Sequence, residues 1–185
     1  MITLPPVGSI GLVKVRGIVG EAIGAAEWLA DKIDRKTFTD YEHAFVLTSV
    51  GDPADPLAQA RVAEAEPGGV RVSYLNEYHG RDVLWIPCPP QYGTAMVHYA
   101  LSYVGVGYSD LDYVAIAAHV LGLDPFQFGR DIVDHTGHVV CSMMAVAAAQ
   151  RSGWPLVAPS EFAGYFTPDD LAKYAPAGAV PQLIA

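Results

Sequence analysis

Positively charged residues are scarce in this sequence, and charged residues of either sign are few. Lys and Arg number 11 against 20 Asp and Glu, so the formal net charge is −9, and charged residues make up only 17% of the chain. Because an acidic protein is repelled by phosphate groups, this balance argues against general nucleic-acid binding and against anionic membrane surfaces. We therefore expect a partner other than nucleic acid, and the composition leaves the oligomeric state open.

Cysteine and long apolar runs are also scarce. The two cysteines, Cys88 and Cys141, are too few for a disulfide-dense scaffold, although a single disulfide between them stays open. The most apolar windows, residues 112–123 and 139–149, are too short to span a bilayer, so we expect no stable membrane insertion. The N-terminus has no basic residue ahead of its apolar stretch, which argues against a signal peptide. We expect a protein made and kept in the cytoplasm, unless another route exports it.

The apolar content is nevertheless sufficient for a core. Hydrophobic residues make up 51% of the 185 residues, which supports a single domain over residues 1–185. Runs of β-branched and aromatic residues predict strands over residues 8–16, 43–50, 60–66, 70–75 and 82–87. Helical spacing and end signals predict helices over residues 21–35, 92–104, 110–121, 141–152 and 168–174. This order predicts an α+β fold with an antiparallel sheet, and no glycine-rich phosphate loop follows a strand.

Local signals also predict how several elements end. Residues 67–69 (PGG) predict a β-hairpin, or two strands around a tight turn. Gly153 closes the helix over 141–152, and Thr167 suits the N-cap of the last helix. The tail from Pro176 is expected to be irregular.

Cys141 is the residue most suggestive of chemistry. It stands at the start of a predicted helix, just after the strand-like residues 138–140. The unpaired N–H groups and the positive dipole end at a helix start stabilise a thiolate and lower the pKa of a thiol. The same N–H groups can bind an oxyanion. The plainer alternative is that Cys141 is a small buried apolar residue on an Ala- and Met-rich helix.

His43 and Glu64 are candidate partners for this thiol. His43 opens an apolar strand and could act as a general base to a nucleophile. If the next strand pairs with it in antiparallel fashion, Glu64 lies on the same face and can hold the imidazole as the third member of a triad. Glu66 has the same parity, so the choice between the two carboxylates stays open. Taken alone, a histidine at such a position is more often a strand-end residue hydrogen-bonded to backbone, and a lone glutamate on a strand usually faces solvent.

The order His43, Glu64, Cys141 resembles that of the circularly permuted papain-like cysteine peptidases of the NlpC superfamily, which are related to the lecithin retinol acyltransferase-like enzymes. The similar segments run through most of the chain: residues 6–13 (PVGSIGLV), 41–46 (YEHAFV), 62–65 (VAEA), 106–110 (VGYSD), 140–144 (VCSMM) and 167–171 (TPDDL). Two positions depart from the family pattern. Ser9 stands where an aspartate is usual, and Met143 where an acidic residue often follows Cys-Ser. These departures leave the subfamily and substrate open.

The resemblance implies a permuted papain-like fold, with an antiparallel sheet packed against helices, and acyl transfer by a Cys141–His43–Glu64 triad. It implies cleavage of an amide bond, such as a peptide bond of bacterial cell-wall material, without any cofactor or metal. Tyr41 is expected to line the oxyanion site, and His138 to line the cleft. Lipid acyl transfer or thioester hydrolysis is the alternative within catalysis, so the substrate is expected to be a small molecule, a peptide or an acyl compound.

Two further alternatives compete with this interpretation. His135, His138 and Cys141 form a His-x-x-His-x-x-Cys pattern whose residue types and spacing can bind zinc. In that case Cys141 would be a metal ligand rather than a nucleophile. A protein that keeps the fold but only binds a partner or has a structural role is the other alternative.

Overall fold

The computed structural model describes residues 3–14, 41–52, 54–66, 68–107 and 141–185. This part of the chain is α+β, as expected, with a six-stranded antiparallel sheet in the order β4-β3-β2-β1-β5-β6. The expected helices over 21–35 and 110–121 and the strand-like residues 138–140 lie outside the described residues. Among the described helices, none is both long enough and apolar enough to cross a membrane.

The elements agree with the sequence expectations to within a few residues. The strands are β1 (Ile10–Val13), β2 (His43–Ser49), β3 (Arg61–Glu66), β4 (Gly69–Tyr74), β5 (Asp82–Ile86) and β6 (Gln182–Leu183). The helices are α2 (Pro90–Ser102), α5 (Cys141–Ser152) and α6 (Pro168–Ala172), with short 3₁₀ turns η1 (Leu75–Tyr78) and η2 (Ala163–Tyr165). Both α2 and α5 are followed by a glycine at positive φ, Gly105 and Gly153, where a side chain would be strained.

One expectation about the C-terminal tail is wrong. The sequence predicts an irregular tail from Pro176, but β6 lies within it and pairs with β5. Ile184 is completely buried beside this short strand. The reason is that two residues are too few to show an alternating pattern, so the tail is ordered by packing and by hydrogen bonds to a neighbouring strand rather than by its own propensity.

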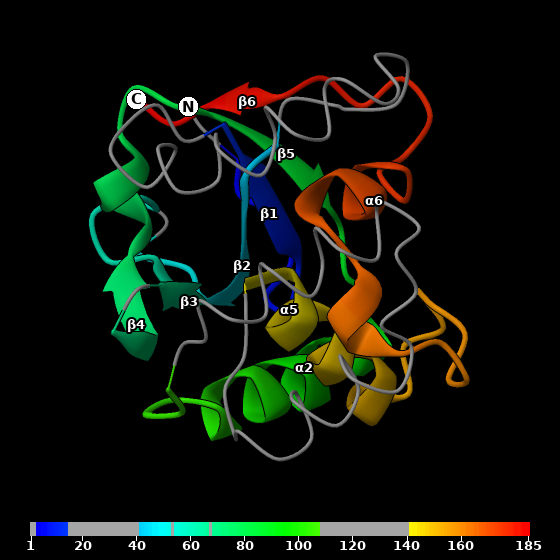
Figure 1. The fold of residues 1–185 in the computed structure, drawn as a ribbon. Helices are drawn as coiled ribbons and strands as arrows, with labels where there is room; N and C mark the ends of the chain where they lie inside the picture. The colour runs from blue at the N-terminus through cyan, green and yellow to red at the C-terminus, as the bar shows by residue number, and fades with distance from the viewer. Residues whose placement is uncertain (1–2, 15–40, 53, 67, 108–140) are drawn as a thin grey trace, which may run out of the picture.

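Side chains alternate between the two faces of the sheet along each strand, and β1, β2 and β5 carry buried side chains on both faces. One face packs against α2 and α5, and we call this cluster the helix-side core; it includes Ile10, Leu12, Ala44, Val46, Met144 and Ala145. The other face forms the opposite-face core, which includes Val13, Phe45, Leu47, Val62, Trp85 and Ile184. Figure 1 shows α5 lying against α2 beside the sheet, with the two chain ends close together near β6.

Gly11 is required by a close approach within the opposite-face core. It pairs with Phe45 on β2 and with Trp85 on β5. A Cβ atom at Gly11 would lie 2.3 Å from Cε2 of Phe45, so the ring occupies the space that any side chain would need. Phe45 in turn contacts the rings of Tyr78 and Trp85, with centroids 4.8 and 5.6 Å away. The absence of a side chain at Gly11 therefore leaves the space that the Phe45 ring occupies in an aromatic cluster, on the face that also carries His43.

We predict that Gly11→Ala lowers the free energy of unfolding by about 1–3 kcal/mol, because the new methyl group forces the Phe45 ring to move in a filled core. Urea unfolding measures the loss. The matched control is the same substitution in a Phe45→Leu background, where the smaller side chain leaves room for the methyl group. The cost should fall there, whereas an equal cost in both backgrounds would contradict the packing explanation.

Candidate active site

His43 and Glu64 are brought together by the pairing of β2 and β3. Glu64 lies directly opposite Phe45, and His43 precedes Phe45 by two residues, so all three side chains share one face. The Nε2 atom of His43 lies 3.1 Å from Oε2 of Glu64. Glu64 has no exposed surface, and His43 is 7% exposed. The expected strand pairing thus places a carboxylate directly against the imidazole.

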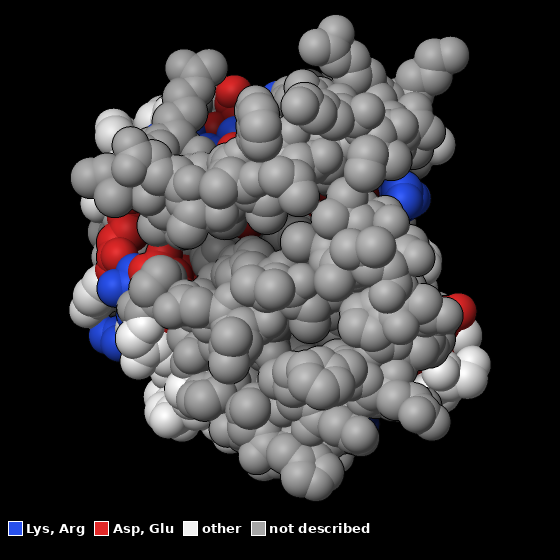
Figure 2. Space-filling view, viewed as in Figure 1, with Lys and Arg blue, Asp and Glu red and all other residues white. Residues whose placement is uncertain are grey.

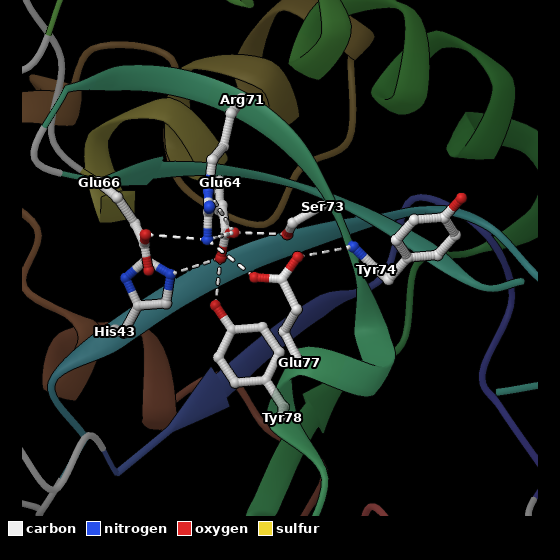
Figure 3. A network of polar contacts seen from close by, with 8 residues as sticks. All are labelled: His43, Glu64, Glu66, Arg71, Ser73, Tyr74, Glu77 and Tyr78. Carbon is white, nitrogen blue, oxygen red and sulfur yellow. Dashed lines mark hydrogen bonds and ion pairs between the residues drawn. The ribbon is translucent and has the colours of Figure 1, made fainter. Parts of the chain in front are cut away.

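Four side chains hold the Glu64 carboxylate. Its Oε1 accepts hydrogen bonds from Ser73 Oγ at 2.5 Å and from Arg71 Nε at 3.0 Å. Its Oε2 contacts His43 Nε2 and accepts a hydrogen bond from the Tyr78 hydroxyl. Figure 3 shows these groups converging on Glu64 from β2, β4 and η1. Because a buried carboxylate is costly unless it is paired and hydrogen-bonded, this full set of partners is what permits a charge at this position.

The partners also keep Glu64 ionised. Burial alone raises the pKa of the carboxyl group, but hydrogen bonds from His43, Ser73 and Tyr78 outweigh burial and lower the pKa to about 2. Glu66, the alternative third residue, has a side chain that is 39% exposed and pairs with Arg71 at 2.9 Å. Of these two carboxylates, Glu64 is therefore the one that contacts His43.

Arg71 balances the acidic charge of this region. Its Nη2 lies 2.9 Å from Glu64 and Glu66 and 3.0 Å from Glu77. Acidic and basic side chains stand next to one another in Figure 2, on the side of the molecule where β3 and β4 lie in Figure 1. His43, Glu64 and Glu66 offer ligand atoms within 4.8 Å of one another, as a metal site would. The guanidinium of Arg71 already supplies a positive charge to both carboxylates, so these residues fit an ion-pair network better than a metal site.

Cys141 is the first residue of α5 and interacts with His43. The thiol is 2% exposed and, like that of Cys88, free, so the disulfide left open by the sequence is absent. Burial raises the pKa of the Cys141 thiol. The charge and hydrogen bond of His43, followed by the backbone N–H groups of Ala44 and Ser142, outweigh burial and lower that pKa below its ordinary value.

The same interaction shifts His43 in the opposite direction. Burial lowers the pKa of the imidazole, but the charge and hydrogen bond of Cys141, followed by those of Glu64, raise it to about 10. A lowered thiol pKa and a raised imidazole pKa favour a thiolate–imidazolium pair. Because Glu64 engages Nε2, Nδ1 is the ring nitrogen left for the sulfur. The arrangement can supply a nucleophile, a proton donor and a carboxylate that orients the ring.

A C-terminal segment, residues 166–170, fastens both chain segments that meet at the site. Ser142, the second residue of α5, donates a 2.5 Å hydrogen bond from Oγ to the carbonyl oxygen of Phe166. The backbone N–H of Tyr41, just before β2, donates to Oδ1 of Asp169 at 3.0 Å. Thr167 caps the start of α6 by accepting from the N–H of Asp170, as the sequence predicts. This segment therefore ties the start of β2 and the start of α5 to one short helix.

The structure describes only some of the remaining residues that the sequence singled out. Tyr41 precedes β2 and packs partly against the helix-side core, the cluster that also contains Cys141. Its expected role at the oxyanion stays a prediction. His138 and the zinc candidate His135 lie outside the described residues. Cys88 is buried, and burial raises the pKa of its thiol to about 11, which makes it a contrast to Cys141.

Four residues at the site were not predicted from the sequence: Arg71, Ser73, Tyr78 and Asp169. The first of these had a usable signal, since the predicted hairpin around Gly68 places Arg71 opposite Glu64. Ser73 follows on the same face of β4, two residues later. Tyr78 and Asp169 had no such signal, because each reaches the site from a turn or a short helix outside the regular strand pairing.

We predict that Cys141 forms a thiolate well below the ordinary thiol pKa of about 8.5. Ultraviolet thiolate absorbance, measured against Cys141→Ser as the blank, follows its titration, while Cys88 stays protonated until the pH nears 11. In His43→Ala the titration should move to higher pH, because burial then dominates. The thiolate–imidazolium pair should persist as the pH rises until His43 loses its proton near pH 10. A wild-type midpoint at the ordinary thiol value would contradict the pairing.

No protein-family model matches this sequence, and a search of the curated proteins finds no significant match to it. The geometry of the site itself is therefore the basis for assigning a function. That geometry consists of a thiol at a helix start, an imidazole beside it and a buried carboxylate behind the imidazole.

Proposed function

We propose that the protein is a thiol-dependent hydrolase that cleaves an amide or peptide bond with Cys141 as nucleophile. The observation that carries the proposal is the position of His43, whose imidazole interacts with Cys141 and, through Nε2, with the buried carboxylate of Glu64. An imidazole held in this way can accept and return a proton at a fixed position. A cysteine that only packed in the core would not need a histidine and a buried charge beside it.

The proposed reaction proceeds in two acyl-transfer steps. The Cys141 thiolate attacks the carbonyl carbon, and the backbone N–H of Cys141 stabilises the resulting oxyanion, with Tyr41 as a further candidate donor. His43 gives its proton to the leaving amine as the C–N bond breaks, which leaves a thioester on Cys141. His43 then takes a proton from water, which attacks the thioester and releases the acid. Glu64 orients the imidazole and stabilises its charged form.

We also propose that the fold is the permuted papain-like fold of the NlpC superfamily. In support, the three elements that carry the site residues have the permuted order along the chain: β2 with His43, then β3 with Glu64, then α5 with Cys141. The antiparallel sheet and the position of α5 against β2 are compatible with that arrangement. Peptides of bacterial cell-wall material are accordingly the first substrates to test, and esters or thioesters of fatty acids are the second.

Activity assays on four variants test this proposal. Cys141→Ala and His43→Ala should each lower kcat/KM on an amide substrate by roughly a thousandfold or more. Cys88→Ala is the matched thiol control and should keep the wild-type rate. Glu64→Gln should lower kcat/KM by at least about tenfold, because the charge that stabilises the imidazolium is lost.

The pattern of results separates the alternatives. Turnover of thioesters or lipid esters alone, with the same dependence on Cys141, would replace amide hydrolysis by the acyltransferase or thioesterase alternative. Undiminished biological activity of the Cys141→Ala protein would contradict catalysis altogether and favour a binding or structural role. Stoichiometric zinc that protects Cys141 would instead support the metal site with His135 and His138.

A further inference from the structure

Tyr78 contacts both His43 and Glu64. Its hydroxyl donates a hydrogen bond to Glu64 Oε2, the same oxygen that His43 Nε2 contacts. Its ring lies against the imidazole with centroids 6.2 Å apart and planes inclined by 20°. The same ring also stacks with Phe45, with centroids 4.8 Å apart. Figure 3 shows the Tyr78 hydroxyl pointing at Glu64 from below, whereas Arg71 reaches it from above.

We propose that Tyr78 is a positioning residue of the Cys141–His43–Glu64 site, an inference that rests on the proposed function. Its hydroxyl fixes the Glu64 oxygen that orients His43, and its ring fixes the plane of the imidazole. Tyr78 touches neither the substrate nor the reacting atoms in this proposal. It acts through Glu64 and His43.

The backbone around Tyr78 is itself well anchored. Tyr78 ends the 3₁₀ turn η1, which follows β4 directly. The first residue of that turn, Leu75, is completely buried and donates its N–H to the carbonyl oxygen of Ala60 at 2.9 Å. Glu77 in the same turn pairs with Arg71, which also holds Glu64. The turn is thus tied to the strand pair that carries the carboxylate, and the hydroxyl has a fixed place.

The chemistry of the hydroxyl suits a permanent donor. Burial and the negative charge of Glu64 raise the pKa of Tyr78 above its ordinary value, so the phenol keeps its proton. It can therefore donate to Glu64 throughout the pH range in which Cys141 and His43 exchange protons. Without this donor, Oε2 keeps only His43 as a partner, so the oxygen that orients the imidazole is held less firmly. The imidazolium is then held less firmly toward the sulfur, and the thiolate loses stabilisation.

The experiment compares the thiolate titration of Cys141 in wild type and in Tyr78→Phe by ultraviolet absorbance. Tyr78→Phe removes one oxygen atom and keeps both ring contacts. We expect its midpoint to rise by about half to one pH unit, which is about threefold to tenfold less thiolate at acidic pH. Amide hydrolysis should show the same upward shift of its acidic limb, with kcat falling more than KM changes.

Two further variants serve as controls. Tyr74→Phe removes the hydroxyl of a tyrosine on β4 whose oxygen accepts from Arg61 Nη2 at 3.0 Å and whose ring points away from Glu64 in Figure 3. It should leave the midpoint at the wild-type value. Ser73→Ala removes the hydroxyl donor to Oε1. It should shift the midpoint less than Tyr78→Phe, because Oε1 does not contact His43.

Each outcome decides between the proposals. A raised midpoint in Tyr78→Phe together with a wild-type circular dichroism spectrum supports the positioning role. An unchanged midpoint overturns that role but leaves the Cys141–His43 proposal standing, provided that the wild-type midpoint is low. A Tyr78→Phe protein that does not fold also overturns it, because the hydroxyl would then serve the fold rather than the site. If the wild-type Cys141 titrates with a midpoint at the ordinary thiol pKa of about 8.5, the proposed function itself is overturned.

Discussion

The buried charge of Glu64 is the constraint on which the site depends. A fully buried carboxylate needs a complete set of partners, and here it has donors from β2, β4 and η1. Removing one partner of a buried charge typically costs about 3–5 kcal/mol, so the fold and the site are fixed by the same contacts. The carboxylate orders the imidazole, and the imidazole in turn sets the protonation of the thiol. Stability and proposed chemistry are therefore coupled through one side chain.

The residues of the proposed site lie on both sides of the sheet. His43 and Glu64 lie on the face of Phe45, whereas Cys141 belongs to the helix-side core. They meet because His43 is the first residue of β2 and Cys141 the first residue of α5, so both stand at element ends. The segment 166–170 fastens these two ends through Phe166 and Asp169. The start of α5 thus places the thiol beside the imidazole at the start of β2.

Much of this arrangement could be predicted from local sequence signals. Runs of β-branched and aromatic residues predicted the strands. Gly153 and Thr167 predicted the end of α5 and the start of α6, because both act locally. Strand parity predicted that His43 shares a face with Glu64 and Glu66, but only the register of β2 and β3 decides that Glu64 makes the contact. The contributions of Tyr78 and Asp169 could not be predicted, since each depends on how a short turn or helix packs against distant strands. β6 was missed for the same reason, because only its pairing with β5 defines it.

The protonation state of His43 tests the central claim most directly. Nitrogen-15 NMR of histidine-labelled protein distinguishes an imidazolium from a neutral ring, and His43→Ala assigns the signal. We predict that His43 is an imidazolium at about pH 8, above the ordinary histidine pKa of about 6.5, and that it is neutral at that pH in Cys141→Ser. A neutral His43 at that pH in the wild-type protein would contradict the thiolate–imidazolium pair and the account built on it.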